Sequence, residues 1–122
     1  MLWLGPDEWL IRSHQPALIN QCSAIAHGAI TDVSSGRAAW RLTGPHSVDL
    51  LAKGCSLDLH SRVFANGACA QTALAHVAVL LHRRDAETFD IYCARSYARH
   101  VWHWLHEAAL EYGCEVGFPL NR

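Results

Sequence analysis

Two segments with apolar side chains at every second position constrain the fold more than any other feature. They are residues 73–81 and 89–93, and their period of two is that of a strand with one buried face. Polar residues 83–87 join them, so we expect one long strand, a turn and a second strand in an antiparallel hairpin. Residues 37–43 alternate in the same way and predict a further strand, with Arg41 on its polar face.

Helical spacing occurs in three other segments. We expect helices at 16–27, in a short segment after Gly44-Pro45, and at 97–112 with Ser96 as N-cap. Their inner faces would carry Leu18, Ile19, Cys22, Ile25, Ala26, Val48, Leu51, Ala52, Val101, Leu105, Ala108 and Tyr112.

The remaining segments complete the expected order of elements. Residues 2–4 and 9–12 flank a turn-type sequence and predict an N-terminal hairpin, and residues 29–34 predict another strand. Helices segregated onto one face of such a sheet give an α+β fold. We therefore predict a small two-layer sandwich, a mostly antiparallel sheet with about three helices packed on it, as a single domain over residues 1–122.

Composition excludes several classes of protein. Charged residues make up 17% of the 122 residues and hydrophobic residues 51%, which excludes intrinsic disorder. A net charge of −1 argues against nucleic acid as a partner. The most apolar stretch, residues 73–81, is too short to cross a membrane. The five cysteines form no Cys-x-x-Cys pair, which indicates free thiols and a cytoplasmic protein.

The last predicted helix carries the sharpest candidate for chemistry. His100, His103 and Glu107 share one face by their spacing, and they offer three ligands to zinc or another divalent metal. The alternative is a solvated face. Cys69 and Cys93 lack a signature context for a nucleophile, and no glycine-rich phosphate loop is present. We therefore assign no catalytic, cofactor-binding or metal-binding residue to the chain.

Two further groups have structural interpretations. Trp102 and Trp104 flank the apolar stripe, where they either border the core or contact a partner. Asp32, with Arg37, is expected to fix a bend before the strand at 37–43.

Several blocks of sequence resemble one known family, the gamma subunit of heterotetrameric sarcosine oxidase. They follow in order along almost the whole chain. The blocks are Trp3-Leu4-Gly5-Pro6-Asp7-Glu8-Trp9-Leu10, Asp32-Val33-Ser34-Ser35-Gly36-Arg37, Leu42-Thr43-Gly44-Pro45, Leu50 to Leu59, Gly67 to Thr72 with Phe64, and Arg95-Ser96-Tyr97 leading to Trp102-x-Trp104-Leu105.

The resemblance implies a fold related to aminomethyltransferase (glycine-cleavage T protein) and folate-binding domains. It also implies an accessory, non-catalytic role beside alpha, beta and delta subunits. In that family the enzyme demethylates sarcosine oxidatively with oxygen and tetrahydrofolate. FAD, FMN, NAD and tetrahydrofolate are attributed to the alpha and beta subunits and zinc to the delta subunit, so no cofactor is expected on this chain.

The chain departs from the family pattern at its N-terminus, and its residues leave two alternative functions open. Family members usually carry further residues before the Trp3 block, which indicates a short variant subunit or a complex acting on another N-methyl amine. A free-standing folate or one-carbon binding module would need a pocket near residues 32–37. A small metal-binding protein or metal-dependent enzyme would use His100, His103 and Glu107.

Overall fold

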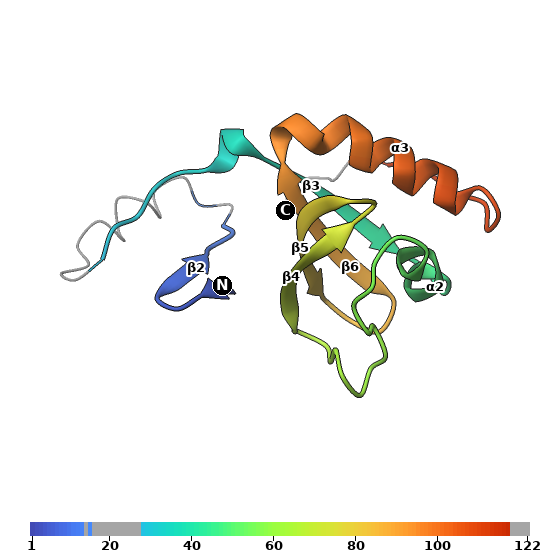
Figure 1. Cartoon of the computed structure of the whole chain (residues 1–122), viewed down its shortest axis with the longest axis horizontal. Helices are drawn as coiled ribbons and strands as arrows, with labels where there is room; N and C mark the ends of the chain where they lie inside the picture. Colours follow the sequence, from blue (N-terminus) through green and yellow to red (C-terminus); the bar gives the residue numbers. More distant parts are fainter. Residues whose placement is uncertain (14, 16–27, 118–122) are drawn as a thin grey trace.

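A four-stranded antiparallel sheet forms the centre of the molecule. The computed structural model describes residues 1–13, 15 and 28–117 (Figure 1). The strands lie in the order β3-β6-β5-β4, which places the two apolar strands β5 and β6 in the middle. Their bounds are β3 Arg37–Thr43, β4 Cys69–Leu74, β5 Val77–Arg83 and β6 Thr88–Ala94. The strands predicted at 37–43 and 89–93 are confirmed.

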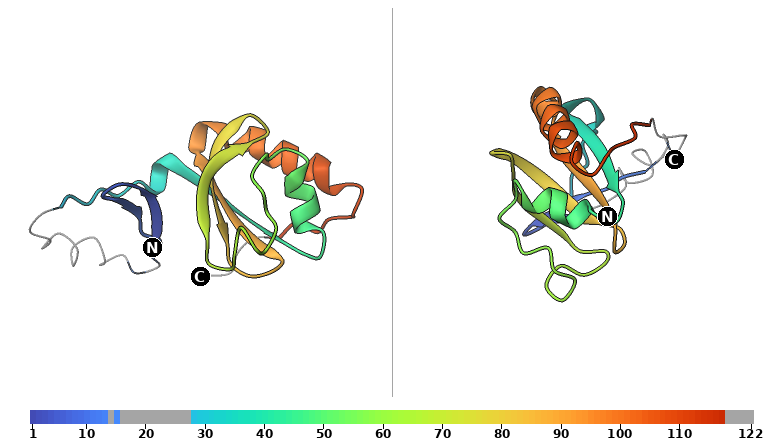
Figure 2. Two further views of the ribbon diagram at one scale, coloured as in Figure 1. Left: turned by 60° about the horizontal axis from the view of Figure 1, so that its bottom comes forward. Right: turned by 90° about the vertical axis from the view of Figure 1, so that its right-hand side faces the viewer.

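Two α-helices cover one face of this sheet and enclose the main core (Figure 2). They are α2 (Ser47–Ala52) and α3 (Ala98–Ala109), and the short 3-10 turns η1 (Ser34–Gly36) and η2 (Arg95–Tyr97) precede β3 and α3. Their apolar sides pack on the inward residues of the strands because both surfaces exclude water there. The buried core includes Leu50, Leu51, Leu74, Val77, Val79, Leu81, Phe89, Ile91, Val101 and Leu105.

An N-terminal hairpin packs on the opposite face of the sheet. Strands β1 (Leu2–Gly5) and β2 (Glu8–Leu10) pair antiparallel, as the sequence predicted. Leu2 forms a second apolar cluster with Leu80 and Tyr92, which point away from the helices. The fold is thus a small α+β protein with antiparallel sheets and two α-helices among the described residues. The helix expected at 16–27 lies outside them.

The long strand predicted at 73–81 is wrong, because the chain reverses in its middle. Ala75 and His76 adopt positive φ values of 51° and 68° and form a two-residue turn between β4 and β5. Such turns normally contain glycine or asparagine, and neither is present here. Leu74 pairs with Val77, so the inward positions change from even to odd numbers and Ala73 is exposed instead of buried.

Three smaller predictions are corrected as well. Residues 29–33 form no strand, and the side chain of Asp32 accepts hydrogen bonds from the Ser34 amide and hydroxyl, which favours a turn. Ser96 lies within η2 and caps no helix. In α2 Leu51 is buried as predicted, but Leu50 is buried beside it and Ala52 is exposed.

Arg83 fixes the loop between α2 and β4 from inside the fold. The sequence predicts Arg83 in a polar turn. In the structure it is the last residue of β5, on the face of the strand that points to the core, and it is only 4% exposed. Its guanidinium donates to the carbonyl oxygens of Leu59 at 2.8 Å and Phe64 at 2.9 Å. A planar group with several N–H donors suits this task, since each buried carbonyl needs a partner.

Candidate functional site

The outer face of the sheet carries a buried aspartate in the central strand β6. The Asp90 side chain is 2% exposed and lies between two direct cross-strand neighbours, Arg41 on β3 and His82 on β5. Side chains two positions along a strand share a face, so Arg84 and Tyr92 lie on this side too. The sheet register therefore gathers one acidic and several basic groups on the face opposite the helices.

Three arginines donate to the Asp90 carboxylate. Arg41 binds it through two nitrogens, with Nε 2.8 Å from Oδ1 and Nη2 3.2 Å from Oδ2. Nη1 of Arg84 and Nη1 of Arg12 each lie 3.1 Å from Oδ2. Arg12 also donates to the Tyr92 hydroxyl at 3.1 Å. We call Arg12, Arg41 and Arg84 the arginine cluster.

The electrostatics of this cluster keep Asp90 ionised. Burial by itself would raise the pKa of Asp90, but the hydrogen bonds from Arg41 and Arg84 outweigh it and hold the pKa below its usual range. The pKa of His82 is lowered, chiefly by burial; the negative charge of Asp90 opposes this shift, and the positive charges of Arg84 and Arg12 add to it. The site therefore holds one carboxylate and three guanidinium groups at neutral pH.

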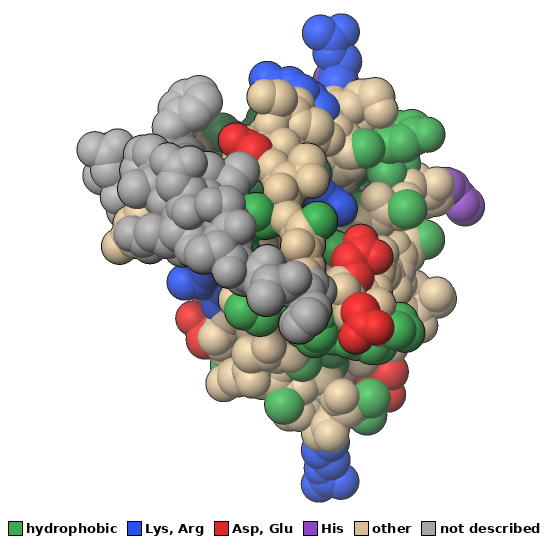
Figure 3. Space-filling model, turned by 90° about the vertical axis from the view of Figure 1, so that its left-hand side faces the viewer, with side chains coloured by type: hydrophobic (Ala, Val, Ile, Leu, Met, Phe, Trp, Pro, Cys, Tyr) green, Lys and Arg blue, Asp and Glu red, His purple; other side chains and the backbone are tan. Residues whose placement is uncertain are grey.

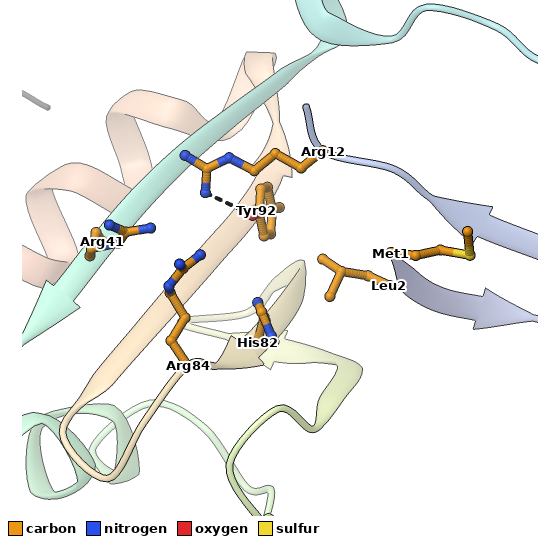
Figure 4. A pocket seen from close by; sticks show the side chains of 7 residues that line it. All are labelled: Met1, Leu2, Arg12, Arg41, His82, Arg84 and Tyr92. Carbon is orange, nitrogen blue, oxygen red and sulfur yellow. Dashed lines mark hydrogen bonds between the residues drawn. The ribbon is translucent and has the colours of Figure 1, made fainter. Parts of the chain in front are cut away.

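A cavity of about 270 Å³ opens beside the arginine cluster. Figure 4 shows that the side chains of Arg12, Arg41 and Arg84 approach it from three separate segments of the chain, and His82 and Tyr92 line it as well. Leu2 and Met1 from the hairpin add an apolar wall. The cavity thus combines cationic donors with a small apolar surface.

Sequence reasoning missed this cluster. Arg12, Arg84 and Asp90 were not singled out, and Arg41 was noted only as part of a polar strand face. One signal was available: Asp90 interrupts the apolar strand sequence Phe89-Asp90-Ile91, where a charge is costly unless it is paired. Its partners could not be identified, because Arg41 is 49 residues away and meets it only through the register of β3 and β6.

The three candidate metal ligands of the alternative interpretation lie on α3 but do not form a metal site. All three residues are exposed, and Nε2 of His100 shares a hydrogen bond with the carbonyl oxygen of Ala75 at 3.0 Å. Within residues 1–13, 15 and 28–117, no group of three or more His, Cys, Asp or Glu side chains could hold a metal ion. Burial raises the pKa of the Cys93 thiol, so this cysteine is not an activated nucleophile.

The two tryptophans of α3 border the core. Trp104 packs against the core cluster, and its ring lies over Gly54. Trp102 stacks on Trp40 with ring centroids 5.4 Å apart. The structure therefore supports the core-border interpretation for both side chains.

A shallow groove of about 680 Å³ lies beside the Asp32–Arg37 bend on the outer sheet face. Val33, Gly36 and Arg37 form one side of it, and small or apolar residues of β4, β5 and β6 form the other. Asp32 fixes the bend as expected. A pocket near this segment is what a folate-binding alternative requires.

The N-terminal hairpin presents a pair of tryptophans to solvent. Trp3 and Trp9 are direct cross-strand partners and are 57% and 51% exposed. The other side of the hairpin packs on Leu80 and Tyr92. Viewed from this end of the molecule, hydrophobic side chains reach the surface in several places (Figure 3). In the described part of the chain, no helix has the length and apolar character needed to cross a membrane.

Comparison with known proteins identifies the family. Residues 1–111 match the profile of the sarcosine oxidase, gamma subunit family. Sarcosine oxidase subunit gamma of Corynebacterium sp. (strain U-96) is 35% identical over 92% of this chain and 57% of the relative. The protein of that name from Corynebacterium sp. (strain P-1) is 34% identical over 94% of this chain and 59% of the relative.

The fold agrees with this relationship. A chain of the heterotetrameric sarcosine oxidase from Corynebacterium sp. U-96, solved in complex with pyrrole 2-carboxylate, superposes with a TM-score of 0.85 at 36% identity. The match covers 95% of this chain and 62% of that one, so the present chain spans less than two thirds of its relatives. The chain belongs to the sarcosine oxidase gamma subunit family.

Proposed function

We propose that this chain is a non-catalytic accessory subunit of a heteromeric, sarcosine-oxidase-like flavoenzyme. The observation that carries the proposal is the family match over residues 1–111. The complex would demethylate sarcosine or a related N-methyl amine oxidatively, coupled to oxygen and tetrahydrofolate. Residues 1–122 would form a single domain whose fold is related to folate-binding domains, and the complex would work in the cytoplasm.

The proposal gives the cofactors to the partners. FAD, FMN, NAD, tetrahydrofolate and zinc would belong to alpha, beta and delta subunits, and this chain would bind none of them. The donor sets fit this assignment: His100 is engaged with a backbone carbonyl, and His103 and Glu107 are solvated. Four of the five cysteines, Cys55, Cys69, Cys93 and Cys114, are free thiols, which suits a reducing compartment.

The Trp3–Trp9 pair is the surface best suited to hold a partner subunit. Tryptophan is enriched at the centres of protein interfaces because it buries a large area at a small entropic cost. Both side chains are more than half exposed, although the other side of the same hairpin is packed on the sheet. An accessory role requires such a surface, and no catalytic geometry.

Affinity purification from the native host tests the proposal. The tagged chain should recover a yellow flavoprotein complex that oxidises sarcosine or a related amine. The double substitution Trp3→Ser and Trp9→Ser should lower recovery of the complex more than tenfold. Val63→Ser is the matched control, since Val63 is 67% exposed and lies far along the chain from the hairpin. Recovery of the wild-type chain alone, without flavin, would refute the proposal.

The groove beside the Asp32–Arg37 bend favours one second candidate, a folate or one-carbon binding module. Val33 and Arg37 give it an apolar and a cationic side, which suit a ligand with an aromatic ring and carboxylates. Titration of the chain with tetrahydrofolate decides the matter. Saturable binding that Arg37→Gln weakens would support this candidate, and no binding would end it.

A further inference from the structure

The arginine cluster carries more positive charge than the carboxylates among the described residues neutralise. All 11 Asp and Glu residues lie in the described part of the chain, and only Asp90 pairs with Arg12, Arg41 or Arg84. One of the three guanidinium groups would suffice to neutralise that carboxylate. The other two place like charges close together, and a further anion would relieve their repulsion.

The excess positive charge is concentrated around one atom, Oδ2 of Asp90. Nη1 of Arg12 and Nη1 of Arg84 both lie 3.1 Å from Oδ2 of Asp90, so the two nitrogens are at most twice that distance apart. Among the described residues, Arg12 and Arg84 donate through Nη1 alone, and their other guanidinium nitrogens have no hydrogen-bond acceptor. The three arginine side chains are between 37% and 43% exposed, so these donors can be reached from solvent.

The cavity shows which kind of anion fits. Guanidinium groups bind carboxylates with parallel hydrogen bonds, and a purely inorganic anion would gain nothing from an apolar wall. Leu2 and the Tyr92 ring line the same cavity, whose volume of about 270 Å³ accommodates a short carbon chain. The hydrogen bond from Arg12 to the Tyr92 hydroxyl orients one guanidinium along this wall.

We propose that Arg12, Arg41 and Arg84 bind a second carboxylate beside that of Asp90, that of an organic acid whose carbon chain lies against Leu2 and Tyr92. The carboxylate comes either from a small acid in solution or from an Asp or Glu side chain of a partner subunit. The recognition chemistry is the same in both cases. The observations behind the site concern only this chain's own residues, so they do not depend on the proposed accessory function; only a carboxylate supplied by a partner subunit would rest on it.

Succinate is the probe for the site on the isolated full chain. Binding is followed by calorimetry and by the melting temperature, with sodium chloride at equal ionic strength as the reference. Succinate at twenty times its dissociation constant should raise the melting temperature by about 3 °C or more beyond the chloride effect. Succinamide, which has the same carbon chain without the charges, should give no rise.

Substitutions locate the binding. Arg12→Gln and Arg84→Gln should each weaken succinate binding about tenfold, because each removes a charge-assisted hydrogen bond. Arg62→Gln is the matched control, since Arg62 is exposed and lies outside the cavity. The melting temperature without succinate verifies that each variant is folded. The proposal is overturned if succinate acts no better than chloride, or if Arg62→Gln loses as much affinity as the cluster variants.

The purified complex distinguishes the two sources of the carboxylate. If a partner supplies it, Arg84→Gln should weaken the complex and succinate should compete with assembly. If a small acid supplies it, assembly should be unchanged while the succinate titration of the chain remains positive. Should no complex be recovered, the accessory function fails, and the titration of the isolated chain still decides the site.

Discussion

Gly54 is the position where a single added methyl group should damage the fold most clearly. A Cβ atom there would lie 2.4 Å from Cζ2 of Trp104 and 2.9 Å from two further atoms of the same ring. Carbon atoms in contact are normally about 3.5 to 4 Å apart, so the ring would have to move by roughly 1 Å. Trp104 packs against the core and cannot move freely.

The expected cost follows from two opposing effects. Overpacking of this kind costs about 1 to 3 kcal/mol, whereas replacing glycine by alanine restricts the unfolded chain and returns about 0.4 to 1 kcal/mol. Gly54→Ala should therefore lower the free energy of unfolding by roughly 1 to 2 kcal/mol. Gly36→Ala is the matched control: nothing lies within 4 Å of its added Cβ, and it should be neutral or slightly stabilising.

Urea unfolding followed by tryptophan fluorescence and circular dichroism measures the difference. A double-mutant cycle with Trp104→Leu identifies the cause, since Gly54→Ala should cost much less once the ring is gone. A coupling of about 1 kcal/mol or more is expected between the two sites. Equal stability of Gly54→Ala and Gly36→Ala, or a coupling near zero, would refute the reasoning.

Three other predictions follow from the charged and strained positions. Asp90→Asn should lower stability at pH 7 by roughly 2 to 3 kcal/mol, because it leaves the arginine cluster without its carboxylate, though the arginines' exposure reduces the effect. The pKa of Asp90 is lower in the folded chain than in the unfolded chain. The contribution of Asp90 to the free energy of unfolding is therefore fully present above the unfolded pKa of about 3.9, and it is lost as pH falls through the folded pKa. Acid titrations of stability should therefore be less steep for Asp90→Asn than for wild type, and equal slopes would contradict the assignment. Arg83→Lys should cost about 2 to 4 kcal/mol in urea unfolding, because the single ammonium nitrogen of lysine cannot replace the three guanidinium nitrogens that donate to the carbonyls of Leu59, Phe64, Asp85 and Ala86. Arg62→Lys should be within about 0.5 kcal/mol of wild type. His76→Gly should raise stability by about 0.5 kcal/mol because glycine accepts the φ of 68° without strain; a loss in thermal unfolding would show that the His76 side chain contributes contacts.

The parts of the fold that the sequence predicted are those with an uninterrupted pattern. Residues 37–43 and 89–93 alternate without a break, and they form β3 and most of β6. The reversal at Ala75–His76 was missed because alanine is compatible with both faces of a strand and neither residue signals a positive φ. Local pattern reading has no means of detecting a turn that the flanking strands impose.

The arginine cluster lay beyond local reasoning for a different reason. Arg12, Arg41 and Arg84 are each typical of a solvated surface when they are considered singly. Only the pairing of β3 with β6 brings Arg41 to Asp90. By contrast, the absence of a sequence motif for catalysis and the ordered family blocks were both readable from the sequence, because they depend on local residues.

The pairing of β3 with β6 also has a consequence for the order of folding. Strands β4, β5 and β6 form a meander joined by short turns, whereas β3 joins β6 through contacts such as Arg41–Asp90, which are 49 residues apart. Closing that long loop is entropically costly, so we expect the meander to form in the transition state and β3 to dock after it. Folding and unfolding rates of two variants would test this order. Ile91→Val, in the meander, should fold more slowly than wild type, whereas Leu42→Ala, in β3, should mainly unfold faster. The ion pair between Arg41 and Asp90 would then form only when the last strand is in place, and it would report that folding is complete.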